Sequence, residues 1–184
     1  MELDSGPAAT EPSSPPPSSG RCAEPRIVVE VSDLQGHLRV DPAALAGVAR
    51  RTLEAEGIRA AELSIGVVDD AAIRVLNRRH LGHDWPTDVI SFPLSGPGAA
   101  ALAGEVVVSA EMAVTTARRA GLDPHAELAL YLVHGVLHLC GRDDQDPGTI
   151  AVMRRREAEV LAAAGLPNTY PMAGPAEPGR ETLR

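Results

Sequence analysis

The spacing of apolar residues changes along this chain, and that change narrows the possible folds more than any other feature of the sequence. Segments typical of β-strands come mostly early, at residues 26–31, 62–68, 88–92 and 105–109. Segments with helical spacing lie between and after them, at residues 42–56, 70–79, 110–120, 124–140 and 148–164. Strands early and helices late predict a mixed α+β domain, with about five helices packed on a small sheet of about four strands.

Capping residues support the predicted ends of these helices. Asp41 and Asp123 stand where a side-chain oxygen can accept a hydrogen bond from the free N–H groups of a first helical turn. Pro42 and Pro124 follow them at the first helical position, where a proline ring is already set for the helix. Gly121 follows the helix predicted at 110–120, as expected of a residue that ends a helix.

The two ends of the chain differ in composition from the middle. Residues 1–24 are rich in Pro and Ser and poor in apolar side chains, so we expect a disordered leader. Residues 165–184 contain repeated Gly and Pro, which break any periodic pattern and predict a flexible tail. A single domain is therefore expected over residues 25–164.

Charge and composition exclude several classes of protein. The 17 basic residues, all Arg, stand against 25 acidic ones, and the net charge of −8 argues against a general duplex-binding protein, so DNA is not an expected partner. Two cysteines suggest no disulfide framework. No apolar run reaches the roughly 18 residues of a membrane span, and the acidic start is unlike a signal peptide. We expect a cytoplasmic protein without a membrane partner.

The segment 129–144 carries the residues most suited to chemistry. His134 and His138 lie four residues apart on a predicted helix, which places both imidazoles on one face, with Cβ atoms about 5 to 6 Å apart. Gly141 can end that helix in a left-handed turn, and Asp144 lies where the turn would return a carboxylate to the imidazoles. Two His and one carboxylate predict a metal site with an open position, as in catalytic zinc sites.

The same spacing occurs in the long zinc-protease motif, with one difference that matters for the chemistry. In those proteases the residue after the first His is Glu, the general base, and here that residue is Gly135. The sequence therefore keeps the metal-site pattern but does not support the proteolytic mechanism.

Three blocks of this sequence resemble the YbeY family of rRNA maturation endoribonucleases. They are Leu76-Asn77 followed by residues 86–93 (PTDVISFP), residues 104–109 (GEVVVS) and residues 134–144 (HGVLHLCGRDD), in matching order and spacing. The resemblance implies a single α+β domain with one metal ion, usually taken to be zinc. It also implies cleavage of single-stranded RNA, with rRNA and the small ribosomal subunit as partners in rRNA maturation and ribosome quality control.

The resemblance places His134 and His138 at the first two metal-ligand positions. The family usually has His where this chain has Asp144, preceded by an Asp that matches Asp143. Because a carboxylate is an accepted zinc ligand, we expect Asp144 as the third ligand, with Asp143 as the alternative.

No residue of the sequence identifies itself as a general base, and three residues are candidates for a catalytic role. The family often carries Arg where this chain has Leu81, so Arg78 and Arg79, just upstream, are candidates to contact a phosphate. Asp88 is a candidate to line the metal cleft, with an equally good reading as a turn residue that starts a strand.

The sequence therefore predicts a metal-dependent, single-strand-specific endoribonuclease of rRNA maturation. Two alternatives stay open: a metal-dependent hydrolase of another class, and a non-catalytic ribosome-associated protein whose metal is structural. With only four aromatic residues in the chain, phosphate contacts and shape are expected to supply most of the RNA affinity. His80 and His83, near Trp85, are not assigned to RNA binding.

Overall fold

The computed structural model describes residues 26–96 and 98–169, which form five helices and four strands. In chain order these are β1 (Ile27–Asp33), α1 (Pro42–Ala55), β2 (Ala61–Val68), α2 (Asp70–Leu81), β3 (Val89–Pro93), β4 (Leu102–Ser109), α3 (Ala110–Ala120), α4 (Pro124–Leu139) and α5 (Pro147–Ala163). The predicted α+β class and all nine predicted elements are confirmed. Helix α2 runs two residues beyond its predicted end and stops at Gly82, which adopts the left-handed conformation.

The predicted leader, residues 1–24, lies outside the described residues, as does the part of the predicted tail from residue 170 onward. At the start of that tail, Leu166 is partly buried against the main core. Within residues 26–96 and 98–169, none of the helices has the length and apolar composition needed to cross a bilayer.

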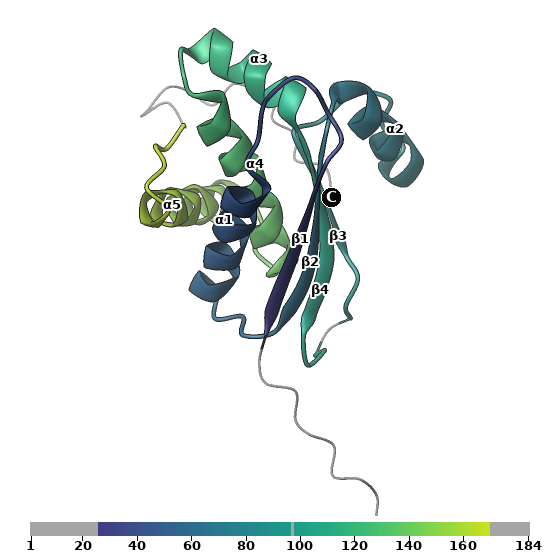
Figure 1. Ribbon diagram of the computed structural model, residues 1–184. Helices are drawn as coiled ribbons and strands as arrows, with labels where there is room; N and C mark the ends of the chain where they lie inside the picture. Colours follow the sequence, from purple (N-terminus) through teal and green to yellow (C-terminus); the bar gives the residue numbers. More distant parts are fainter. Residues whose placement is uncertain (1–25, 97, 170–184) are drawn as a thin grey trace, which may run out of the picture.

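The four strands form one mixed sheet in the order β1-β2-β4-β3. Strand β2 pairs in parallel with both β1 and β4, while β3 runs antiparallel to β4 and forms one edge of the sheet. Parallel neighbours need long crossover connections. The link from β1 to β2 contains α1, and the link from β2 to β4 contains both α2 and β3, as can be followed in Figure 1.

Alternate side chains of the sheet enter two different cores. Val106 and Val108 of β4 belong to the large core beneath α1 and α4, whereas Val107 belongs to a smaller cluster with Ile73 of α2. This is the two-residue alternation of a strand that is covered on both faces. Figure 1 accordingly shows α1, α4 and α5 on one side of the sheet and α2 on the other.

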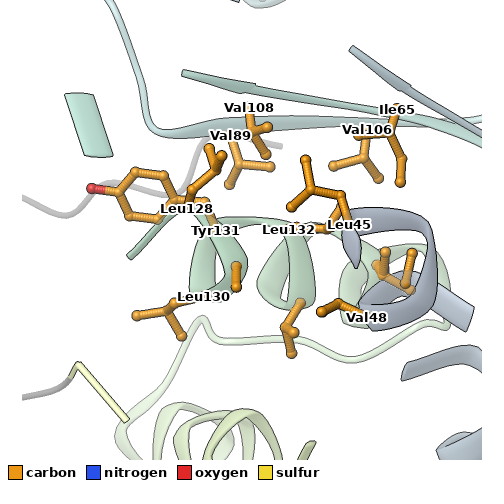
Figure 2. Close-up of a cluster of buried hydrophobic side chains, with 14 of the residues drawn as sticks. Leu45, Val48, Ile65, Val89, Val106, Val108, Leu128, Leu130, Tyr131 and Leu132 are labelled. Atoms are coloured by element: carbon orange, nitrogen blue, oxygen red, sulfur yellow. The ribbon is translucent and has the colours of Figure 1, made fainter. Parts of the chain in front are cut away.

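Helix α4 forms the centre of the large core. Its residues from Ala126 to Leu137 are all buried, which is typical of a helix that is covered on every side. It contacts β3 and β4 on one flank and α1, α3 and α5 on the others. In Figure 2, Val89 and Val106 of the sheet point toward α4, and Leu45 of α1 lies beside it. The position of any side chain on α4 is therefore fixed by the packing of the whole domain.

Gly135 allows α4 to approach the sheet closely. A Cβ atom at this position would lie 2.7 Å from a methyl group of Val106 and 2.8 Å from one of Val89. The Ser91 hydroxyl donates a hydrogen bond of 2.9 Å to the Gly135 carbonyl, across the same contact. Because interiors are close-packed, even one extra methyl group here must push the helix away from the sheet or distort it.

We expect Gly135→Ala to lower the free energy of unfolding by about 1–3 kcal/mol, the usual cost of overpacking a core. Urea denaturation followed by circular dichroism measures this change. Gly47→Ala is the matched control, because Gly47 lies within α1 and a Cβ there meets nothing within 4 Å. That control should gain up to about 1 kcal/mol, the difference in helix propensity. Equal stability of the wild type and Gly135→Ala would contradict the close-approach argument.

Candidate metal centre

The three predicted metal ligands come together at the end of α4. The Nε2 atoms of His134 and His138 lie 2.9 Å apart. The carboxylate of Asp144 lies 3.7 Å from Nε2 of His134 and 3.6 Å from Nε2 of His138. One potential ligand atom from each of the three residues lies within 4.8 Å of the others. His134 is almost fully buried, while His138 and Asp144 are partly exposed, so the cluster opens to solvent on one side.

A tight turn after α4 brings Asp144 back to the helix. Gly141 is left-handed, with φ of 86°, and its N–H donates to the His138 carbonyl, while Arg142 N–H donates to the Leu137 carbonyl. These bonds satisfy carbonyl groups that the helix end would otherwise leave free. The predicted role of Gly141 is therefore confirmed, and the turn explains how a residue beyond the helix reaches the side chains of its last two turns.

A buried carboxylate on another helix orients His134. Glu157 of α5 is fully buried, and its Oε1 lies 2.6 Å from Nδ1 of His134. The carboxylate oxygen accepts the hydrogen bond from Nδ1, so Nε2 of a neutral His134 presents its lone pair to the cluster. Such a carboxylate–histidine pair is typical of metal-binding histidines.

Glu157 is not among the site residues predicted from the sequence, although a signal for it is present. Glu157 lies on the buried face of α5 together with Met153, Val160 and Leu161. An acidic residue at such a position must find a partner, because burying an isolated charge is costly. The sequence could not tell which of the distant histidines would be that partner.

A backbone carbonyl orients His138 in the same way. Nδ1 of His138 lies 3.0 Å from the carbonyl oxygen of Arg142. A carbonyl oxygen cannot donate, so this Nδ1 also carries the proton, and Nε2 of a neutral His138 is again a lone pair.

These assignments leave three acceptors facing one another. Two imidazole lone pairs, 2.9 Å apart, and the Asp144 carboxylate repel each other unless a proton or a metal cation lies between them. Each separation is shorter than twice a zinc–ligand bond of about 2.0–2.2 Å, so a single ion can contact all three groups. The residues therefore fit a divalent metal ion such as zinc.

The pKa values of the two histidines move in opposite directions. Burial acts to lower the pKa of His134, but the neighbouring carboxylates, Glu157 first, outweigh it and raise that pKa. Burial and the adjacent His134 lower the pKa of His138. The cluster thus favours one positive charge at His134 and resists a second at His138, as expected where two imidazoles share one site.

Glu56 holds the turn that carries the cluster. This residue, at the end of α1, accepts two hydrogen bonds from the Arg142 guanidinium, at 2.7 and 3.1 Å, and one of 2.7 Å from Arg156 of α5. Its side chain is only 8% exposed. Arg156 also donates to the Ala55 carbonyl. The pair of arginines joins α1, α5 and the turn, and so fixes the Arg142 carbonyl that orients His138.

Asp143 takes part in the turn through its side chain. Its Oδ1 accepts a 2.7 Å hydrogen bond from the backbone N–H of Asp144. The carboxylate that joins the two imidazoles in the cluster belongs to Asp144.

Asp88 lies beside the cluster, immediately before the edge strand β3. Its carboxylate is among the charges that raise the pKa of His134. Its Oδ1 accepts hydrogen bonds from the Thr87 hydroxyl at 3.0 Å and from Val89 N–H at 2.9 Å, and its carbonyl accepts one from Ser109 at the end of β4. Asp88 therefore both begins the strand and contributes charge near His134.

Arg78 and Arg79 occupy the last turn of α2, on the opposite face of the sheet from α4. Both are exposed, and the Arg78 guanidinium lies 3.9 Å from the Asp84 carboxylate. Leu81, at the position where the related family often has Arg, is partly buried against the smaller cluster under α2. The structure thus gives Leu81 a packing role and leaves the two arginines facing solvent.

Glu56 makes the stability of the domain depend on pH. Burial acts to raise the pKa of Glu56, but the bonds from Arg142 and Arg156 outweigh it, so its pKa lies below its ordinary value of 4.5. A group with a lowered pKa stabilises the fold above its unfolded pKa and loses that effect as the pH falls through its folded pKa.

We expect Glu56→Gln to lower the free energy of unfolding at neutral pH by about 1–3 kcal/mol, because two guanidinium groups lose a charged acceptor. The difference from the wild type should shrink as the pH falls below about 4.5, which urea denaturation over a pH series would measure. Glu159→Gln is the control: Glu159 is 52% exposed and also pairs with Arg156, so its loss should have a smaller effect. If the difference in free energy of unfolding between the wild type and Glu56→Gln stays constant down to low pH, this role of Glu56 is contradicted.

The family model and the similar proteins that match this chain carry the same family name. Residues 30–165 match the family model described as Endoribonuclease YbeY. A protein of that name from Pelotomaculum thermopropionicum is 43% identical over 148 residues, which cover 75% of this chain and 97% of that protein. One from Carboxydothermus hydrogenoformans is 39% identical over 142 residues, covering 76% of this chain and 99% of its relative.

Other similarities are shorter or more distant. An Endoribonuclease YbeY from Anaeromyxobacter dehalogenans is 49% identical over 115 residues, so this chain spans only 60% of the length of that relative. A solution structure of a protein from Thermotoga maritima superposes with a TM-score of 0.53 and 23% identity, over 74% of this chain and 91% of the other, and shares its fold. The match over residues 30–165, together with the near full-length relatives, shows that this chain belongs to the YbeY family.

Proposed function

We propose that this protein is a metal-dependent endoribonuclease that cleaves single-stranded RNA during maturation of small-subunit rRNA, in the cytoplasm and in association with the ribosome. The observation that carries the proposal is the convergence of three acceptors, His134 Nε2, His138 Nε2 and the Asp144 carboxylate, in a member of a family described as endoribonucleases. Zinc is the proposed ion, because two imidazoles and one carboxylate are a common catalytic zinc set.

In this proposal, His134, His138 and Asp144 hold the ion and leave one position for substrate. A bound zinc ion would supply Lewis acidity, which polarises a phosphate oxygen or makes water a better nucleophile. Glu157 and the Arg142 carbonyl keep both imidazoles in the tautomer that presents Nε2.

Three further residues have proposed roles toward RNA. Asp88 is the candidate to accept or position a proton, supported by its charge beside His134. Arg78 and Arg79 are the candidates to contact RNA phosphates, supported by their exposure on the last turn of α2. In this way a protein with a net charge of −8 can bind RNA through a small basic region.

The structure bears differently on the two alternative functions. A peptidase with the long zinc-protease mechanism would need a Glu where Gly135 stands. A Cβ there already meets Val106 and Val89 at under 3 Å, so a larger side chain has no room. A non-catalytic, ribosome-associated protein would keep the metal and lose only the cleavage. That second alternative is separated from the proposal by an activity measurement.

We expect the purified protein to bind one zinc ion and Asp144→Ala to lose most of it, because the two imidazoles alone leave the charge of the ion poorly balanced. Metal content after dialysis, measured by mass spectrometry, gives the result. Glu157→Gln should keep zinc but bind it about 10- to 100-fold more weakly, the usual effect of removing a residue that orients a ligand.

Asp143→Ala is the matched control, since Asp143 is the neighbouring acid and its Oδ1 bonds the backbone of Asp144. It should retain zinc. If Asp143→Ala loses the ion and Asp144→Ala keeps it, the proposed ligand assignment is wrong.

We expect the zinc-loaded protein to cleave a single-stranded RNA and to leave the matching duplex uncut, as read on a sequencing gel. His138→Ala should reduce cleavage by a factor of at least about 100, because the ion no longer has its ligand set. A chelator should abolish cleavage, and added zinc should restore it. A zinc-loaded protein that cuts no RNA over a range of pH and divalent ions would instead support the non-catalytic alternative.

A further inference from the structure

Trp85 is the only tryptophan of the chain, and it is partly exposed to solvent. It lies in the loop between α2 and β3 and is 47% exposed. The exposed part of this large aromatic ring remains in water, where it adds nothing to the burial that drives folding. Such rings are enriched where proteins bind a flat apolar partner.

The backbone on both sides of this ring is held in place. Asn77, fully buried on α2, donates a 2.9 Å hydrogen bond from its side chain to the Trp85 carbonyl. Arg74 binds the Asp84 carboxylate with two hydrogen bonds of 2.9 and 3.1 Å. Two residues after Trp85, Thr87 is buried. The indole is therefore exposed on an ordered loop.

A second aromatic ring lies against the indole. The His83 imidazole is 4.6 Å from the Trp85 ring, centre to centre, with an angle of 51° between the two planes. Single-stranded bases stack on rings of this kind, histidine included. The contact limits the freedom of the indole before any ligand arrives, which lowers the entropic cost of stacking.

The charges around the ring suit a polyanion. The last turn of α2 carries Arg78, Arg79 and His80. Asp84, the acid that precedes Trp85 in the sequence, binds Arg74 and lies 3.9 Å from Arg78. A stacking ring beside cationic groups is the usual arrangement for binding single-stranded nucleic acid.

The loop leads directly into the metal centre. Asp88 lies three residues beyond Trp85, and the next residue, Val89, packs against Gly135, which directly follows His134. Three residues span at most about 10 Å, so the backbone of Trp85 lies within that distance of Asp88. A strand whose phosphate lies at the metal would place a base a few nucleotides away at the indole.

We propose that Trp85, supported by His83, is a stacking site for one base of a single-stranded RNA bound at the metal centre. The inference rests on the proposed function for the identity of the ligand. It also gives a reason for selectivity: the faces of a base within a duplex are already covered by its neighbours, so only an unpaired strand can place a base on the indole.

Fluorescence of the full-length protein tests this directly, because Trp85 is the only tryptophan. A single-stranded RNA oligomer should quench the emission, read before any cleavage product forms. An oligomer of the same length with abasic residues, which keeps the phosphates and lacks the bases, should leave most of the emission unchanged. Equal quenching by both oligomers, or none by either, would overturn the stacking site.

Kinetics of variants provide the second measurement. Trp85→Ala should raise KM for single-stranded RNA on the order of 10-fold, the usual effect of losing one stacked base, with zinc content and kcat little changed. Trp85→Phe should recover most of the affinity. Leu94→Ala is the matched control, because Leu94 is also an exposed apolar residue, 69% exposed, just after the far end of β3. It should leave KM unchanged.

These measurements separate the stacking site from the proposed activity. If the protein cleaves RNA but Trp85→Ala has the KM of the wild type and the emission does not respond to RNA, the stacking site is wrong and the nuclease stands. If the protein cleaves nothing yet the emission responds to bases and not to abasic RNA, the stacking site stands and the nuclease proposal fails. Unfolding curves confirm that the variants are folded.

Discussion

The contact between α4 and the sheet is the constraint on which the rest of the structure depends. Helix α4 is buried on every side, and the missing side chain at Gly135 lets its backbone lie directly against β3 and β4. A helix that is close-packed on all sides cannot rotate or slide without opening cavities. The two imidazoles carried by its last turns therefore have a fixed place, and the hydrophobic core sets the geometry of a polar site.

The polar site in turn uses groups from three separate parts of the chain. The helix supplies two histidines, the turn that follows it supplies Asp144 and the Arg142 carbonyl, and α5 supplies Glu157. Each histidine has its Nδ1 occupied, so while the rings are neutral both Nε2 atoms are acceptors. This hydrogen-bond pattern alone explains why the cluster favours a proton or a metal cation between its acceptors, without reference to any related protein.

The sequence predicts the helices and strands more completely than it predicts the contacts of the candidate site. Helices with an Asp cap and a following Pro, such as α1 and α4, were located to within a residue, because those signals are local. The convergence of His134, His138 and Asp144 was also predictable, since a helix and a glycine turn determine it. Long-range partners were not predictable: the pairings of Glu157 with His134 and of Glu56 with Arg142 depend on how helices pack.

The pairing of Glu157 with His134 also sets an order of assembly. During synthesis α5 leaves the ribosome after all the other helices and strands described here, because it is the last of them in the chain. His134 on α4 is therefore synthesised before Glu157, and it lacks its orienting carboxylate until α5 has been made. A chain interrupted before α5 would contain every strand described here, together with His134 and His138, and would still lack the carboxylate that orients His134. The orientation of His134 is therefore complete only once α5 has packed against α4.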